Sequence, residues 1–132
     1  MITSPPYLGT YDYTAHHRRR FGWLGFDPAL LEEREIGARR RPSPGRYRQD
    51  VMAYLGELAR VLRPGAFAYL LIGDSTAGAE VIPGDLEIRR AAAECDLEVV
   101  AVAAQGRPEN FAPARGILPE GKREHLIALR RR

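Results

Sequence analysis

The chain has 132 residues, 45% of them apolar, and its 20 Lys and Arg residues exceed its 17 Asp and Glu residues by three. This composition excludes an intrinsically disordered chain and is sufficient for a single domain with its own core. The single cysteine, Cys95, excludes an internal disulfide framework and a cysteine-rich zinc site, and we expect no metal. No apolar run approaches the ~20 residues that span a bilayer. Because a secretory signal is also missing, we expect a cytoplasmic protein without a membrane segment.

The N-terminal part of the chain predicts two helices. Residues 12–24 begin with Asp12, which is a plausible cap, and contain several aromatic side chains. Asp27 and Pro28 are a stronger start signal, because Asp is favoured at the N-cap and Pro at the first helical position. We expect a short helix from Pro28 to about Ile36, with Leu30 and Leu31 facing inward.

A loop and a long helix come next. Residues 37–45 are rich in Gly, Pro and Arg, and this composition predicts a mobile basic loop. Residues 46–62 then predict the clearest helix of the chain, because its apolar residues recur with a helical period. This stripe consists of Val51, Leu55, Leu58 and Leu62. Pro64 and Gly65 end the helix.

The C-terminal half alternates strands and a helix. Residues 66–72 form a continuous apolar run, which is typical of a strand buried in a parallel sheet with helices on both faces. A polar loop, residues 73–76, follows at the carboxyl end of that strand, where ligands gather in open α/β sheets. The remaining predicted elements are a helix over 85–95 capped by Asp85, a strand over 97–104, an irregular segment over 107–123 and a strand over 125–129.

This order predicts an α/β fold, with parallel strands and a final antiparallel strand. The last strand is expected to be antiparallel because the segment before it does not have the pattern of a crossover helix. The first strand is only a stub, residues 1–3, which runs directly into Ser4-Pro5-Pro6-Tyr7. We therefore expect residues 1–132 to form one partial domain.

The Ser4-Pro5-Pro6-Tyr7 segment, which we call the arm, has an unusual combination of rigidity and hydrogen-bond acceptors. Two consecutive prolines fix φ and remove two backbone donors, and each proline favours an extended residue before it. The Ser4 hydroxyl and the Pro5 carbonyl can each accept one hydrogen of an exocyclic amine on cytosine or adenine. This would localise the lone pair of a poor nucleophile and direct it at an electrophile. Tyr7 can stack on a base taken out of its duplex.

Two arginine clusters lie close to the arm in sequence. They consist of Arg18, Arg19 and Arg20, and of Arg39, Arg40 and Arg41. Arginine suits phosphate groups because its planar guanidinium can bind them bidentately. We expect both clusters to contact nucleic acid, although solvated surface charge is the plainer reading. For the arm, the plainer reading is a processed or disordered terminus.

Three segments together resemble a known family. Thr3-Ser4-Pro5-Pro6-Tyr7 resembles the (D/N/S)PP(Y/F/W) motif of the DNA amino-methyltransferases, and serine is most typical of the cytosine-directed members. Residues 57–65 with 67–73 resemble the helix, turn and strand that follow this motif, and residues 124–129 resemble the final antiparallel strand. The resemblance covers almost the whole chain.

The resemblance implies the C-terminal half of a class I S-adenosyl-L-methionine-dependent methyltransferase domain, with a partial Rossmann-like sheet. It implies that Ser4, Pro5, Pro6 and Tyr7 are catalytic, that the cofactor is S-adenosyl-L-methionine and that the substrate is a DNA base. The family binds its cofactor with an FxGxG turn and an acidic residue, and neither is present here. The N-terminal cofactor-binding half is therefore expected on a second polypeptide or on a missing N-terminal segment.

Three interpretations remain open. The first is a truncated or split enzyme that methylates cytosine N4 or adenine N6 in DNA. The second is an RNA or tRNA base methyltransferase, whose arm looks similar. The third is a non-catalytic nucleic-acid-binding remnant of the same fold.

Overall fold

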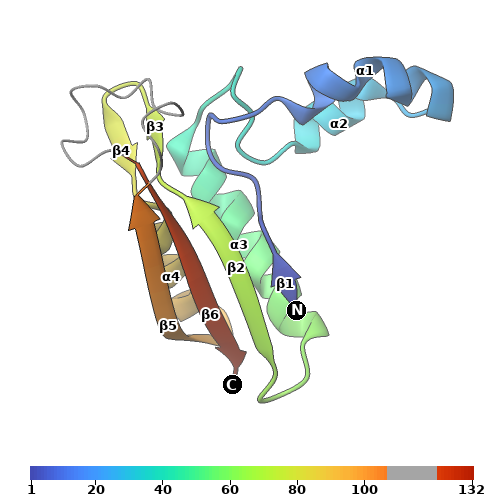
Figure 1. Ribbon diagram of the computed structural model, residues 1–132. Helices are drawn as coiled ribbons and strands as arrows, with labels where there is room; N and C mark the ends of the chain where they lie inside the picture. The colour runs from blue at the N-terminus through green and yellow to red at the C-terminus, as the bar shows by residue number, and fades with distance from the viewer. Residues whose placement is uncertain (107–121) are drawn as a thin grey trace.

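A four-stranded sheet forms the centre of the structure, a computed structural model that describes residues 1–106 and 122–132 (Figure 1). Its strands, in spatial order, are β1 (Ile2–Thr3), β2 (Phe67–Gly73), β6 (Arg123–Arg131) and β5 (Leu97–Gly106). β1 pairs with β2 in parallel, whereas β6 is antiparallel to both β2 and β5. The prediction of a mixed α/β fold with a final antiparallel strand is confirmed. Most of the predicted irregular segment, residues 107–121, lies outside the described residues.

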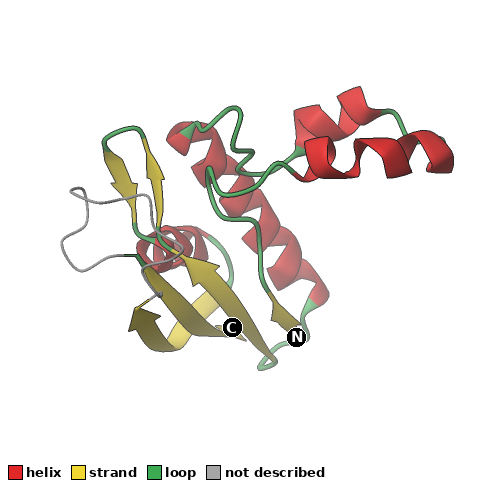
Figure 2. Cartoon of the chain, turned by 45° about the horizontal axis from the view of Figure 1, so that its top comes forward, coloured by secondary structure: helices red, strands yellow, loops and turns green. Residues whose placement is uncertain are grey.

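Two helices pack behind the sheet, α3 (Pro44–Val61) and α4 (Gly84–Glu94) (Figures 1 and 2). α3 begins two residues before the predicted start, because the Ser43 hydroxyl accepts a hydrogen bond from the Arg46 backbone N–H and Pro44 takes the first helical position. Of the predicted stripe, Val51, Leu55 and Leu58 are buried, and Leu62 packs against this core from the end of the helix. The hydrophobic core therefore lies between the sheet and these two helices.

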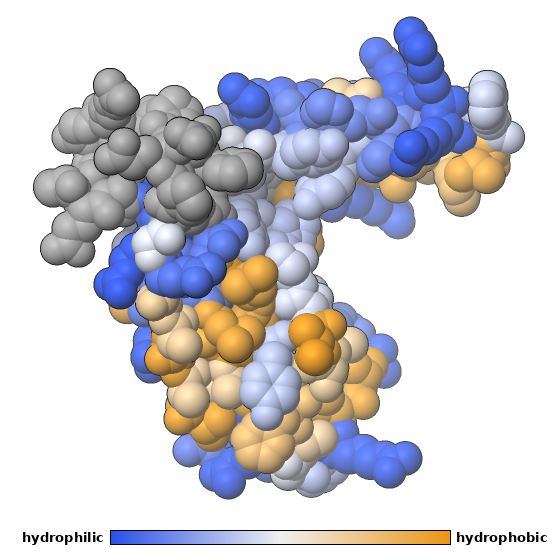
Figure 3. Space-filling view, viewed as in Figure 1, coloured by the Kyte–Doolittle hydropathy of each residue, from blue (hydrophilic) through white to orange (hydrophobic). Residues whose placement is uncertain are grey.

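The opposite face of the sheet is bare in the described part of the chain, and the prediction that β2 is covered on both faces is wrong. Along β2, Ala68, Leu70 and Ile72 are fully buried, whereas the alternate residues Phe67, Tyr69 and Leu71 are 40–43% exposed. Figure 3 shows apolar side chains spread across this face. α3 connects β1 to β2 and α4 connects β2 to β5, so both connections move in the same direction across the sheet. Because crossover connections are right-handed, both helices lie on the same face of the sheet.

The helices α1 (Tyr13–Leu24) and α2 (Pro28–Arg34) form a hairpin that projects from the body of the domain (Figures 1 and 2). The Asp27 carboxylate caps α2 by accepting a hydrogen bond from the Ala29 backbone N–H, as predicted. Leu30, predicted to face inward, is instead 55% exposed, because the hairpin extends away from the core. At its tip, Trp23 is 92% exposed. None of the described helices has the length and apolar character needed to cross a bilayer.

The segment after β2 is not a plain loop as predicted but a small hairpin, β3 (Ser75–Ala77) and β4 (Glu80–Ile82). Asp74 joins it to the sheet. The Asp74 carboxylate accepts hydrogen bonds from the backbone N–H groups of Gly84 and Arg123, both at 3.0 Å, and lies 2.8 Å from the Nε2 of His125. Asp85, the predicted cap of α4, lies in its first turn, while Asp74 satisfies the helix's first N–H.

Candidate functional site

The arm leaves β1 and is held in place by two tyrosines of α3. The Tyr47 hydroxyl donates a hydrogen bond to the Pro6 carbonyl at 3.2 Å, and the Tyr54 hydroxyl donates one to the Thr3 hydroxyl at 3.2 Å. Tyr47 is 3% exposed, and its burial, with smaller contributions from Glu87 and Tyr7, raises the pKa of its phenol well above the usual 10. Tyr47 therefore stays protonated and keeps donating. In this way the long helix fixes the position of the arm.

The arm lines one wall of an open cavity of about 320 Å³. The cavity residues are Ser4, Pro5, Tyr7, Thr10, Tyr11, Tyr13 and His17. This volume lies at the lower end of the range for small-ligand sites. Three of the four predicted catalytic residues meet here, whereas Pro6 is the one that Tyr47 anchors.

The hydrogen-bond acceptors of the arm are not equivalent. The Pro6 carbonyl is occupied by Tyr47, but no partner of the Pro5 carbonyl occurs in the described part of the chain. The Ser4 hydroxyl lies 3.5 Å from the Tyr7 hydroxyl, which is itself 3.5 Å from the Leu71 carbonyl. Contacts of this length are weak. Among the residues that line the cavity, Ser4 and Pro5 therefore each have an acceptor, the Ser4 hydroxyl and the Pro5 carbonyl, without a strong partner in the described chain.

Aromatic side chains form the rest of the cavity wall. Tyr11 stacks on His16 with ring centroids 4.4 Å apart and an interplanar angle of 11°. Tyr13 meets Tyr11 at 4.6 Å with the rings tilted by 60°. One side of the cavity is therefore a supported group of aromatic rings rather than a single side chain.

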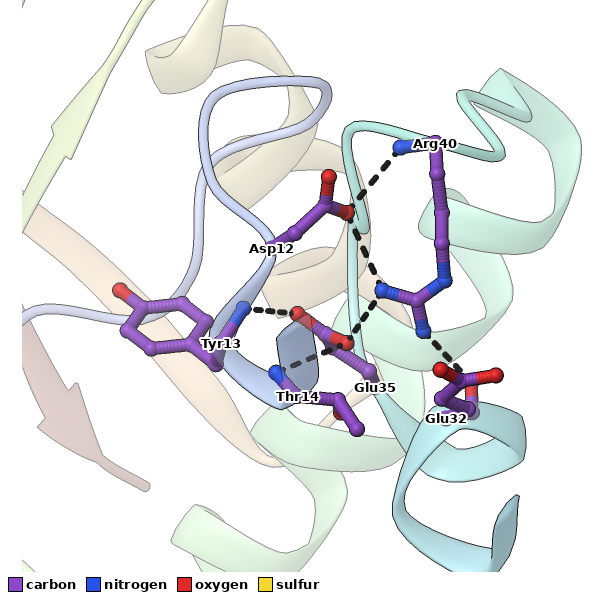
Figure 4. Close-up of polar contacts among 6 residues, drawn as sticks. All are labelled: Asp12, Tyr13, Thr14, Glu32, Glu35 and Arg40. Carbon is purple, nitrogen blue, oxygen red and sulfur yellow. Dashed lines mark hydrogen bonds and ion pairs between the residues drawn. The ribbon is translucent and has the colours of Figure 1, made fainter. Parts of the chain in front are cut away.

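An ion-pair cluster holds the start of α1, where Tyr13 lies (Figure 4). The Glu35 carboxylate accepts hydrogen bonds from the backbone N–H groups of Tyr13 and Thr14, at 2.5 and 3.4 Å. It also pairs with the guanidinium of Arg40 at 3.0 Å, and the same guanidinium lies 3.1 Å from the Asp12 carboxylate. Asp12 is the N-cap residue of α1, as predicted, but its side chain binds Arg40 and makes no capping hydrogen bond. The Glu35 carboxylate accepts the hydrogen bonds of the first helical N–H groups instead.

The electrostatics of this cluster keep both partners charged. Burial by itself raises the pKa of Glu35, but the hydrogen bonds from Thr14, Arg40 and Tyr13 outweigh it, so the pKa lies below 4.5. Burial by itself lowers the pKa of Arg40, but the contacts with Glu35, Glu32 and Asp12 outweigh burial, so the pKa of Arg40 is raised. A carboxylate at the N-terminus of a helix also interacts favourably with the helix dipole. The cluster is thus a stable structural joint at neutral pH.

The structure separates the six predicted nucleic-acid contacts into two groups. Arg40 is engaged within the protein, because it binds Asp12, Glu35 and the Glu32 carbonyl. Arg20 lies 3.2 Å from the ring of His17. The remaining four are exposed and make no ion pair within residues 1–106 and 122–132: Arg18, Arg19, Arg39 and Arg41.

The 37–45 segment is tied to the arm region by hydrogen bonds from Arg39 N–H to the Tyr11 carbonyl and from Gly9 N–H to the Gly37 carbonyl. Its mobility stays a prediction.

A second cluster of titratable groups, Asp74, Asp85 and His125, lies at the carboxyl end of β2. One ligand atom of each lies within 4.8 Å of the others. Both oxygens of Asp74 already accept hydrogen bonds from the protein backbone, and one also contacts His125. Within this cluster, Asp74 therefore joins β2 to α4 and β6.

Sequence reasoning missed several residues of the site. Tyr11, Tyr13 and His17 have one usable signal, a run of aromatic residues within ten positions of Tyr7. Tyr47 lies one turn before Val51 on the apolar stripe, and a phenol on a buried stripe indicates a polar partner. Glu35 has no such signal, because it acts on a helix that begins 22 residues earlier.

Comparison with known proteins finds a similar structure but no similar sequence. No protein-family model and no curated protein matches the sequence. Among solved structures, the chain is similar to a candidate DNA modification methylase from Thermus thermophilus, with a TM-score of 0.53 and 17% sequence identity. The match covers 99% of this chain but only 43% of that structure's chain. The likeness shows a shared fold: a mixed α/β sheet compatible with part of a methyltransferase-like domain.

Proposed function

We propose that this chain is the base-holding part of an enzyme that methylates an exocyclic amine in DNA, cytosine N4 or adenine N6. The observation that carries the proposal is that two cavity-lining residues of the arm, Ser4 and Pro5, each have an acceptor without a strong partner in the described chain. Ser4 and Pro5 line the same cavity as Tyr7, while Tyr47 takes the neighbouring Pro6 carbonyl. The shared fold with a candidate DNA modification methylase supports the same reading.

In this proposal the three arm residues that line the cavity each have one task. The Pro5 carbonyl and the Ser4 hydroxyl each accept one hydrogen of the amine, which directs its lone pair away from the ring. Tyr7 contacts the face of the base. Tyr47 and Tyr54 do not touch the base but hold the arm so that the two acceptors keep their spacing. Arg18, Arg19, Arg39 and Arg41 bind the phosphates that flank the base.

S-adenosyl-L-methionine is the methyl donor that the resemblance implies, but the described residues do not fit it. The N-terminus of α4 lies beside the carboxyl end of β2, where such a ligand would need free backbone N–H groups. There the Gly84 N–H is already bound by Asp74. The backbones are also in close contact, since a Cβ on Gly84 would lie 2.8 Å from the Gly73 carbonyl oxygen. We propose that the donor is bound by a second polypeptide or by a segment that precedes residue 1.

Binding to modified bases tests the acceptor pair. The probes are short single-stranded oligomers of abasic nucleotides with one central base, labelled with fluorescein and followed by anisotropy at low salt. We expect tighter binding when the base is cytosine or adenine than when it is N4,N4-dimethylcytosine or N6,N6-dimethyladenine, because the dimethylated bases lack both amine hydrogens. Ser4→Ala should reduce that preference, because one of the two acceptors is lost. Equal binding of amino and dimethylamino bases by the wild-type chain would contradict the proposal.

The rate of DNA methylation, where a partner polypeptide restores it, is a second test of the acceptor pair. Ser4→Ala should lower the rate on the order of 10²-fold, as does the loss of one oxyanion-hole donor in other enzymes. Tyr7→Ala should cost about 1–3 kcal/mol of base stacking. Mass spectrometry of the digested DNA identifies the methylated base. Undiminished rates in both variants would leave the arm with a structural role only.

A further inference from the structure

We propose that Tyr13 forms the second wall of the base pocket and that Glu35 positions it. This inference rests on the proposed function, and it assigns roles to two residues outside the arm. The ligand class is a planar nucleobase that has left its stack, either in a single strand or flipped from a duplex. On this reading the first turn of the projecting helix α1 is part of the substrate site.

The position of Tyr13 carries the first step of the argument. Its ring lines the same cavity as Ser4, Pro5 and Tyr7, and it is 45% exposed. The centroid of the Tyr11 ring lies 4.6 Å from that of Tyr13, and Tyr11 is itself stacked on His16, so Tyr13 is in contact with a stacked pair of rings. Exposed aromatic rings with such support suit stacking, because little side-chain freedom is lost when a base binds.

The contacts of Glu35 carry the second step. The Glu35 carboxylate accepts a hydrogen bond from the backbone N–H of Tyr13, the first residue of α1, and the Glu35 side chain is only 6% exposed. Figure 4 shows the ring of Tyr13 pointing away from the carboxylates and the guanidinium. The cluster thus fixes the backbone of Tyr13 while leaving its ring to face the cavity. Glu35 is therefore a positioning residue, and Arg40 and Asp12 keep Glu35 in place.

The chemistry of the two walls divides the recognition. Every base has a π face, so stacking on Tyr13 tolerates all four bases. The acceptors of the arm distinguish an amino base from one without amine hydrogens. Tyr13 should therefore strengthen the binding of any base, whereas Ser4 should affect only amino bases.

The experiment compares Tyr13→Ala with Tyr69→Ala, because Tyr69 is similarly exposed, at 41%, but lies on the bare face of the sheet. Two oligomers are titrated into the 132-residue chain, one with a single central cytosine among abasic nucleotides and one without any base. Tyr13→Ala should weaken binding of the cytosine oligomer about fivefold or more and leave binding of the abasic oligomer unchanged. Tyr13→Phe should bind like the wild type, and Tyr69→Ala should bind both oligomers like the wild type.

The outcomes separate this inference from the proposed function. If Tyr7→Ala loses the base-dependent affinity and Tyr13→Ala keeps it, the inference is wrong and the proposed function stands. If the wild-type chain binds both oligomers equally, neither survives. Circular dichroism checks the folding of each variant, and Tyr13→Leu, which keeps apolar volume without a π face, replaces Tyr13→Ala if that variant unfolds.

A second pair of variants tests the role of Glu35. Glu35→Gln should reduce the ratio of cytosine-oligomer to abasic-oligomer affinity, because the backbone at Tyr13 is no longer held by a carboxylate. Glu87→Gln is the matched control: Glu87 is also a buried carboxylate in an arginine cluster, 2% exposed in its side chain, but it lies on α4. An equal change of the ratio in both variants, or no change in either, would exclude a positioning role for Glu35.

Discussion

The phenol of Tyr47 lies 3.2 Å from the carbonyl oxygen of Pro6 and donates a hydrogen bond to it. This contact joins a buried position of the longest helix to an arm that has no helix or strand of its own. It also occupies a carbonyl to which no backbone N–H of the described residues donates. The position of the arm thus depends on a residue 41 positions later in the sequence.

Tyr47→Phe should loosen the arm without opening a cavity, because only the hydroxyl is removed. We expect a loss of about 0.5–1.5 kcal/mol in the free energy of unfolding, measured in urea. We also expect weaker discrimination between cytosine and its dimethylated form. Tyr54→Phe, which loses a contact with Thr3 rather than with the arm itself, should retain more of that discrimination. If discrimination is identical in the two variants and the wild type, Tyr47 does not position the acceptors.

The stability that Glu35 contributes should depend on pH in a defined direction. Its pKa is lowered in the folded state, so the contribution is present above the unfolded value of about 4.5 and is lost as the pH falls below it. Glu35→Gln should therefore lower the free energy of unfolding by about 1–3 kcal/mol at pH 7. The difference from the wild type should shrink as the pH falls below about 4.5. A difference that stays constant down to about pH 3 would refute this assignment.

The salt dependence of nucleic-acid binding should separate the arginines of residues 39–41. Replacing Arg39 and Arg41 together by Ala should lower the slope of log affinity against log salt by roughly one to two, since each phosphate contact on a single strand contributes about 0.7. Arg40→Ala should instead lower the melting temperature, because it leaves Glu35 and Asp12 without their partner. The opposite pattern would make Arg40 the phosphate contact and the other two plain surface charges.

Asp74→Ala should be among the most destabilising single changes in the chain. It would leave the backbone N–H groups of Gly84 and Arg123 and the ring of His125 without their acceptor in a buried site. A loss of about 3–5 kcal/mol is expected for breaking a buried charged network. Asp85→Ala, in the first turn of α4, is the control and should cost less than about 1 kcal/mol. Chemical denaturation followed by circular dichroism measures both.

The chain by itself should bind S-adenosyl-L-methionine weakly or not at all. The physical reason is that the helix terminus at the carboxyl end of β2 has its first N–H satisfied by Asp74. Isothermal titration calorimetry provides the measurement. A one-site curve in the low micromolar range would overturn both this expectation and the proposal of a separate donor-binding segment.

Local signals in the sequence predicted elements well and long-range contacts poorly. The apolar stripe through Leu55 predicted α3 because periodicity depends only on near neighbours. The Ser43-Pro44 cap is also a local signal, but it was assigned to the predicted loop, so the predicted start was two residues late. The contact of Glu35 with Tyr13 depends on how two helices meet, and no local pattern encodes that. The alternation of buried and exposed residues in β2 was missed for a different reason. Phe67 and Leu71 are apolar like the buried residues between them, so composition alone could not reveal the bare face.

The antiparallel strand β6 has a consequence for the order in which the chain can fold. β6 lies between β2 and β5, and in the described sheet β6 is the one strand with which β5 pairs. During synthesis, β2 and β5 both leave the ribosome before their common neighbour, which consists of residues 123–131 near the C-terminus. Until then both strands expose unpaired backbone groups, which are templates for aggregation. In the described sheet β6 therefore connects β2 to β5, and a nascent chain that stops before it would leave both strands without their common neighbour.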